Sequence, residues 1–188
     1  MTKQNKLNWK EIQKSLHSKE DKIFYGALKK LEKNGESNCL NELINIIHRS
    51  SDEKRIDALF TFLSRLKKPG SEKTMIEIAK ESKNEPIKNR LLNSFWNSGL
   101  DYTPYFSDFV DFAVNGNYIT ALECLTIIEN LKGPLKEEQI LDAQLSLKSY
   151  LERKKEKDEK APLISEIAIF IKETNQQLSD LNPDFFDS

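Results

Sequence analysis

The fold is decided by the stretch NEPIKNRLLNSFWNSG, which occupies residues 84–99. Three of its apolar residues, Ile87, Leu91 and Phe95, recur at steps of four, which places them on one face of an α-helix. Gly99 follows at once, and a glycine at that position is typical of a helix end. The stretch therefore predicts an amphipathic helix over about 85–98, with one face turned toward a core.

The same pattern returns along the chain at a nearly constant interval. The leading isoleucines, Ile23, Ile56, Ile87 and Ile119, are 33, 31 and 32 residues apart. Further helices are predicted over 19–33, 52–67 and 118–132, each closed by Gly or Pro-Gly punctuation. The expected core faces include Ile23, Ala27 and Leu31 in the first helix, Ile119, Leu122 and Ile128 in the last, and, as test positions, Ile56, Leu91 and Leu122.

A second series of helices is predicted between the first. These partner helices cover 38–49, 72–81 and 104–114. Leu43, Ile76 and Phe109 occupy matching places in them, each 33 residues after the last. Two interleaved series with one shared period are typical of stacked helical hairpins.

The C-terminal part departs from this period. One long helix is predicted over 135–157, and a final helix begins at Pro162. Terminal units of helical stacks are usually irregular, because they must cap an open core. We expect a single domain over 1–188, with repeats over 19–134, capping helices over 135–181, and a tail at 182–188 that is docked, frayed or a short linear motif.

Residues 84–92, NEPIKNRLL, resemble the start of the second helix in short HEAT repeats, where an acidic residue and a proline precede an aliphatic and a basic residue. Residues 51–59 are a looser match without the proline, and 117–122 keep only the apolar spacing. This HEAT-like resemblance covers about 19–134. It implies an all-α α-solenoid of antiparallel helix pairs with a period of about 33 residues, a long C-terminal capping pair, and a concave face lined by second helices. It brings no catalytic residues.

The charge and hydropathy of the sequence argue against some classes of function. The net charge is −1, which argues against a general nucleic-acid binder, although the basic segment 1–35 keeps a nucleic-acid-associated protein open as the alternative. No run of 18 apolar residues predicts a membrane span, and no signal-peptide pattern is present, so a cytoplasmic location is expected.

No pattern of catalytic or metal-binding residues is present. His17 and His48 lie in different helices without a Cys/His cluster, and Cys39 and Cys124 are expected to be buried thiols. No phosphate-binding glycine loop or nucleophile motif occurs. The sequence therefore predicts no metal, no organic cofactor and no enzymatic activity. A buried cleft with converging carboxylates would reopen the enzyme reading.

The leading hypothesis is a non-catalytic scaffold that binds a protein or peptide partner on the concave face. The charged and amide residues expected there point away from the apolar stripes: Lys54, Asp57, Arg65, Lys88, Asn89 and Glu123. Aromatic residues are concentrated in 95–118. They either form a wide buried face in the core, or include an exposed side chain, such as Trp96 or Tyr105, that anchors a partner.

Overall fold

The computed structural model describes residues 8–34, 39–153 and 157–181. Within these ranges the chain forms ten α-helices and one short 3₁₀ helix, and no strand. The prediction of an all-helical fold is confirmed. The helices are α1 Trp9–Leu16, α2 Asp21–Asn34, α3 Leu40–Arg49, α4 Glu53–Leu63, α5 Ser71–Glu81, α6 Glu85–Asn97, α7 Phe106–Asn115, α8 Tyr118–Glu129, α9 Glu137–Arg153 and α10 Ala161–Leu181, with the 3₁₀ helix η2 at Thr103–Tyr105.

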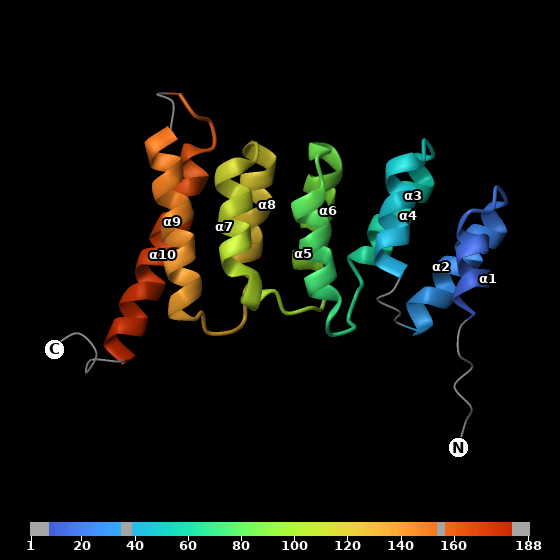
Figure 1. The fold of residues 1–188 in the computed structure, drawn as a ribbon, viewed down its shortest axis with the longest axis horizontal. Helices are drawn as coiled ribbons and strands as arrows, with labels where there is room; N and C mark the ends of the chain where they lie inside the picture. The colour runs from blue at the N-terminus through green and yellow to red at the C-terminus, as the bar shows by residue number, and fades with distance from the viewer. Residues whose placement is uncertain (1–7, 35–38, 154–156, 182–188) are drawn as a thin grey trace, which may run out of the picture.

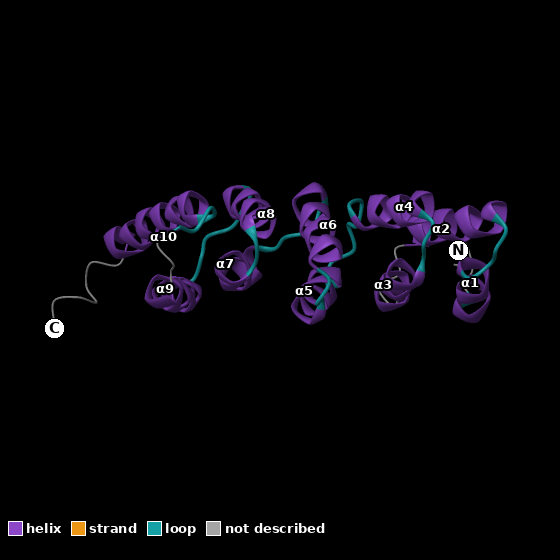
Figure 2. Ribbon diagram, turned by 90° about the horizontal axis from the view of Figure 1, so that it is seen from above, coloured by secondary structure: helices purple, strands orange, loops and turns teal. Residues whose placement is uncertain are grey.

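The helices stand side by side along an elongated molecule, with α1 and α2 at one end and α9 and α10 at the other (Figure 1). Seen along the helices, they form two rows (Figure 2). The odd-numbered helices make one row and the even-numbered helices make the other. Contacts run along each row, as between α4 and α6 or α7 and α9, and across the rows, as between α7 and α8.

Three even-numbered helices begin with the same kind of cap. The side chain of Asp52 accepts hydrogen bonds from the backbone N–H groups of Lys54 and Arg55 at the start of α4. Asn84 and Asn117 cap α6 and α8 in the same way. These side chains satisfy N–H groups that have no partner inside the helix, which fixes where each helix starts.

One continuous apolar core runs between the two rows. Ile56 and Leu91 are buried in it, as predicted. Cys39 and Cys124 are buried as well. Most of the aromatic cluster also belongs to this core: the ring of Phe95 stacks on Tyr102 at 4.7 Å between centroids and meets Phe109 edge-on.

The prediction that Leu122 is a core residue was wrong, because its side chain is 39% exposed. Helix α8 carries apolar residues around most of its circumference, so three- and four-residue spacing did not identify the buried face. The residues that fill the core from α8 are Thr120, Ala121, Cys124, Leu125, Ile127 and Ile128.

Two of the leading isoleucines were also assigned to the wrong face. Ile23 and Ile119 are exposed. In α2 the buried stripe is led by Phe24 and continues through Ala27, Leu28 and Leu31. The large ring of Phe24 fills the core, which turns the neighbouring Ile23 outward by about 100° around the helix axis.

Helix α1 was not predicted from the sequence. It is short, and it packs against α2 through Ile12 and Leu16. Two predicted helices end early: the one predicted over 52–67 ends at Leu63, and the one over 118–132 ends at Glu129. The helix predicted over 135–157 is described from Glu137 to Arg153, and residues 154–156 lie outside the described ranges. The tail at 182–188 lies outside the described residues.

Candidate binding groove on the even-numbered helices

Neighbouring helices of the even-numbered row are joined by arginine side chains. Arg55 on α4 reaches back to α2, where its Nη2 donates to Asp21 Oδ1 at 2.6 Å. Its guanidinium carbon lies 4.8 Å from the centroid of the Phe24 ring. The same side chain donates to the backbone oxygens of Ser18 and Lys19, so it ties three segments together.

Arg90 on α6 repeats this arrangement one helix further along. Its Nη2 donates to Asp57 Oδ1 on α4 at 2.6 Å, and its guanidinium carbon lies 4.2 Å from the Phe60 ring centroid. In both cases the carboxylate precedes the ring by three residues, which puts both on one helix face. A guanidinium that pairs with a carboxylate and covers an aromatic ring suits a half-exposed contact between helices.

The next junction, between α6 and α8, uses different side chains. Glu123 on α8 accepts hydrogen bonds from Asn93 Nδ2 and from the Trp96 indole N–H, both at 3.2 Å. The hydroxyl of Thr120, which is buried, lies 2.6 Å from Asn89 Oδ1. Polar side chains therefore connect α4, α6 and α8 across a shared surface.

A groove of about 620 Å³ opens on this surface. It runs over α4, α6 and α8, and its walls combine acidic, basic, amide, hydroxyl and apolar groups. The lining residues are Asp57, Phe60, Thr61, Ser64, Asn89, Arg90, Asn93, Ser94, Asn97, Ile119 and Glu123.

Three asparagines form the middle of the groove. Asn89, Asn93 and Asn97 follow one another at steps of four along α6, so they lie one above another on the same face. Asn97 Nδ2 donates to the backbone oxygen of Asn93. Asn89 Oδ1, Asn93 Nδ2 and Asn97 Nδ2 are already hydrogen-bonded within the protein. The remaining groups, Asn89 Nδ2 and the Oδ1 atoms of Asn93 and Asn97, form a column that can pair with peptide N–H and C=O groups.

The structure gathers four of the eight predicted site residues in or beside this groove. Asp57, Asn89 and Glu123 line it. Trp96 is exposed next to it and is joined to Glu123 by its indole N–H. Lys54 is exposed on the first turn of α4 and does not line the groove.

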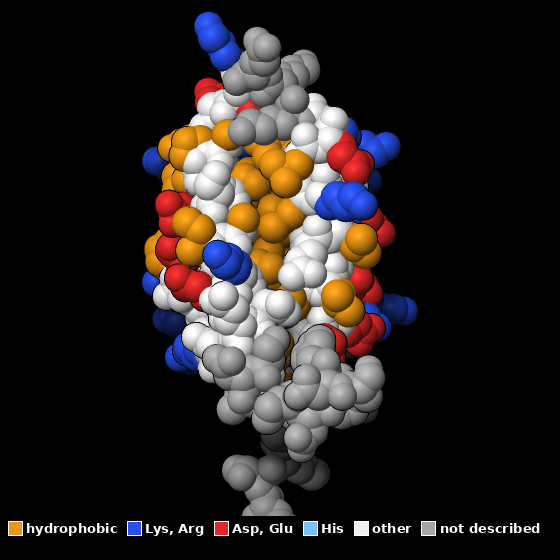
Figure 3. Space-filling view, turned by 90° about the vertical axis from the view of Figure 1, so that its left-hand side faces the viewer, with side chains coloured by type: hydrophobic (Ala, Val, Ile, Leu, Met, Phe, Trp, Pro, Cys, Tyr) orange, Lys and Arg blue, Asp and Glu red, His pale blue; other side chains and the backbone are white. Residues whose placement is uncertain are grey.

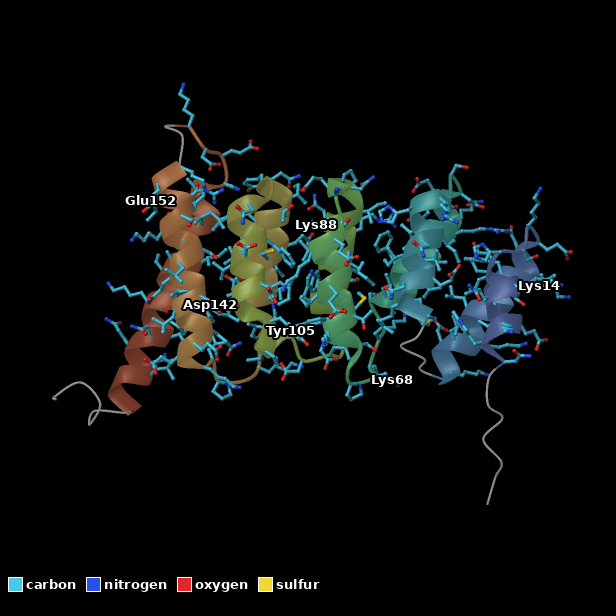
Figure 4. All side chains as sticks on the ribbon, viewed as in Figure 1. Lys14, Lys68, Lys88, Tyr105, Asp142 and Glu152 are labelled. Carbon is cyan, nitrogen blue, oxygen red and sulfur yellow. The ribbon has the colours of Figure 1, made fainter. Side chains whose placement is uncertain are left out.

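The other three predicted residues lie elsewhere. Arg65 follows the end of α4, 3.7 Å from Glu32, and borders a separate cavity. The ammonium of Lys88 lies 4.5 Å from the centroid of the Phe112 ring on α7, so it faces the odd-numbered row. Tyr105 sits in η2 at the lower end of α7 (Figure 4), where partial burial raises the pKa of its hydroxyl.

Sequence reasoning missed most of the groove lining. Arg90 and Phe60 could have been found, because an acid three residues before a ring, with an arginine about 33 residues after the acid, occurs at Asp21-Phe24-Arg55 and again at Asp57-Phe60-Arg90. The asparagine column is also visible as a four-residue step. Nothing in the sequence alone indicated that these features share one surface.

A larger cavity, of about 720 Å³, lies where α9 leads into α10. Several of its polar groups already bind other parts of the protein. Lys160 donates to the backbone oxygens of Ala113, Val114 and Gly116 at the end of α7, and the Tyr150 hydroxyl donates to Asp158. We therefore regard it as a structural junction.

The described ranges also bear on metal sites, membrane spans and reactive thiols. No group of three or more His, Cys, Asp or Glu side chains is placed to hold a metal ion there. No helix in these ranges combines the length and apolar character needed to cross a membrane. Burial raises the pKa of the Cys124 thiol above its usual value, which keeps it protonated and unreactive at neutral pH.

Comparison with known proteins gave no relative: no protein-family model, no curated protein and no solved structure matches the chain.

Proposed function

We propose that this protein is a HEAT-like α-solenoid of five antiparallel helix pairs, and that it binds an extended peptide segment of a partner protein in the groove over α4, α6 and α8, without catalysis. The pairs are α1–α2, α3–α4, α5–α6, α7–α8 and α9–α10. Two rows of helices and an interval close to 33 residues support the architecture. A cytoplasmic location stays part of the proposal.

The asparagine column of α6 is the observation that carries the peptide assignment. Asn89, Asn93 and Asn97 rise by about 6 Å per step along the helix, and side chains on one side of an extended peptide recur every 6–7 Å. Amides at that spacing can bind alternate main-chain groups of a peptide that runs along α6.

The edge of the groove supplies an apolar anchor. Ile119 lines the groove from α8, and Tyr118 and Leu122 on the same helix are exposed beside it. Interfaces gain most of their affinity from a few apolar or aromatic anchors surrounded by polar contacts. A peptide with one large apolar side chain between polar residues would suit this surface.

The charges of the groove favour a peptide over a nucleic acid. Its arginine, Arg90, already pairs with Asp57 and lies near Glu53, and Glu123 adds a further negative charge. Phosphate binding needs unpaired cations. A nucleic-acid-associated role through the basic N-terminal third stays the alternative.

The proposal can be tested by selecting random peptides on the immobilised protein and measuring their affinity by calorimetry. We expect Ile119→Arg to weaken selected peptides by more than about tenfold, since it places a charge and excess volume in the groove. Ile169→Arg is the matched control, because Ile169 on α10 is exposed to 49% and Ile119 to 47%. Peptides that bind the Ile119→Arg variant as tightly as the wild-type protein would contradict the proposal.

The same variants can test the alternative. Random duplex DNA would be titrated into the wild-type protein at several salt concentrations. Affinity that falls steeply with salt, together with a selection that yields no peptide, would favour the nucleic-acid reading.

A further inference from the structure

Helix α9 exposes large apolar side chains on its solvent face. Leu141, Leu145 and Leu151 are exposed to 53%, 64% and 66%. Within the described residues, the other odd-numbered helices α1, α3, α5 and α7 expose no large apolar side chain. Single exposed apolar residues are ordinary, but three on one helix form a patch that commonly marks an interface. We call these three residues the leucine stripe.

The leucine stripe lies opposite the buried face of α9. That face consists of Gln139, Ile140, Ala143 and Tyr150. Leu141 and Leu145 are one turn apart. At 100° per residue Lys148 lies about 20° to the other side of Leu141, and Leu151 lies about 80° from Leu141 on that same side, at the edge of the stripe. The leucine stripe is therefore separate from the side chains that pack α9 against α7 and α10.

The stripe belongs to the end of the molecule where the row stops. Asp142 and Glu152 mark α9 at this end in Figure 4. Figure 3 looks onto this end, where α9 and α10 lie side by side, and shows an apolar band between the two helices with polar side chains on either side. A stack of helices that ends in apolar surface can be extended or covered by another helical unit.

Helix α9 is acidic at its start, where Glu137 and Glu138 lie, and of mixed charge toward its end, where Lys148, Glu152 and Arg153 lie. Glu137 and Glu138 occupy the first turn, and Lys148 lies three turns further on. When two copies of α9 run antiparallel with Leu141 opposite Leu145 of the other copy, each Lys148 comes near the Glu137–Glu138 pair of its partner. Antiparallel helix dipoles also oppose one another favourably. Lys148 and the Glu137–Glu138 pair therefore give α9 a charge pattern that suits an antiparallel second copy.

We propose that two copies of this chain associate through α9, antiparallel and about a two-fold axis, with the leucine stripes facing each other. Head-to-tail association would instead place α9 of one copy against α2 of the next, and these two surfaces are less complementary. The large apolar side chains exposed at the other end of the molecule are Ile23 and Tyr25 on α2, and Asp21 beside them is already bound to Arg55. Two-fold dimers are the commonest symmetric assemblies, and they need only one self-complementary surface.

The expected affinity follows from the size of the contact. Helix α9 has 17 residues, so it is about 25 Å long. A contact formed mainly by one helix from each copy falls near or below the roughly 1,200 Å² buried by the smaller specific interfaces. The dimer is therefore expected to dissociate in the micromolar range.

Sedimentation equilibrium of the full chain over a series of protein concentrations tests the proposal. The wild-type protein should shift from monomer to dimer, and Leu141→Glu/Leu145→Glu should raise the dissociation constant by more than about tenfold. Leu122→Glu is the matched control, since Leu122 is an exposed leucine on α8. Circular dichroism should show unchanged helix content in both variants.

Charge reversal tests the antiparallel orientation. Lys148→Glu alone, and Glu137→Lys/Glu138→Lys together, should each weaken the dimer, while the triple combination should restore it. Failure of the triple variant to restore would overturn the antiparallel pairing. A wild-type protein that stays monomeric, or a dimer that Leu141→Glu/Leu145→Glu leaves intact, would overturn the proposal and point to a different occupant of the stripe, such as a partner protein or residues 182–188. These outcomes are independent of peptide binding in the groove, because the two surfaces share no residue.

Discussion

At the scale of single residues, two glycines illustrate how backbone conformation decides the effect of one methyl group. Gly70, the N-cap of α5, has φ of +91°, and a Cβ added there would meet no atom within 4 Å. Gly26, inside α2, has equally open surroundings and ordinary helical geometry. Any difference between alanine variants at these positions must therefore come from the backbone.

We expect Gly70→Ala to lower the free energy of unfolding by about 1–2 kcal/mol, because left-handed φ is unfavourable for residues with a Cβ. Gly26→Ala should raise it by about 0.5–1 kcal/mol, because alanine loses less entropy than glycine in a helix. Urea denaturation of both variants checks this. Equal effects of the same sign would show that one of the two conformations is misassigned.

Leu91 and Leu122 form a second informative pair, because both are leucines in even-numbered helices but only Leu91 is buried. Leu91→Ala should cost about 2–5 kcal/mol through lost burial and a cavity. Leu122→Ala should change stability by less than about 0.5 kcal/mol. The comparison is made by chemical denaturation, and a large loss for Leu122→Ala would restore the original assignment of the α8 face.

At the scale of elements, the end of α7 depends on a residue from a distant segment. The ammonium of Lys160 binds backbone oxygens of Ala113 and Val114 in the last turn of α7 and of Gly116 just beyond it. A helix end carries oxygens without partners, and a cation there also interacts favourably with the helix dipole. Burial lowers the pKa of Lys160, which indicates that this contact is partly shielded from water.

Lys160→Met should therefore destabilise the protein by about 1–3 kcal/mol, since it keeps most of the side chain's length and removes the donor. Lys157→Met, at an exposed position nearby, is the control and should have little effect. Thermal unfolding followed by circular dichroism measures both. A Lys160→Met variant as stable as the control would mean that water replaces the ammonium without cost.

The sequence predicted which segments form most of the helices, but not which face of each helix is buried. Strong periodicity and Gly or Pro punctuation placed α2 to α10 within a few residues. Where apolar residues surround a helix, as in α8, only packing against α6 and α7 decides which of them are buried. Helix α1 was missed because two buried residues, Ile12 and Leu16, make too short a pattern to recognise.

The groove was predicted only in part for a related reason. Asp57, Asn89 and Glu123 were found because each lies opposite an apolar stripe. Lys88 was expected on the same surface, but its long side chain reaches over the Phe112 ring toward the other row. The direction a long side chain takes depends on neighbours that are remote in sequence, so helical spacing could not reveal it.

At the scale of the whole molecule, the two rows keep contacts local. Extensive contacts between helices join elements that are at most three places apart in chain order. Arg55 and Arg90 span only about 33 residues each when they tie one even-numbered helix to the next. The molecule therefore has no closure between its first and last helices.

The restriction of contacts to elements that are close in sequence has a consequence for the folding rate. Forming a contact between residues close in sequence costs little loop-closure entropy, so a chain of this kind should fold on the microsecond to millisecond timescale despite its length. Folding can also start at several places and spread to adjacent helices. The contacts of Arg55 and Arg90 join neighbouring even-numbered helices, so these helices should unfold together. At the two ends of the molecule each helix has fewer neighbours, so backbone amide hydrogens there should exchange with solvent first.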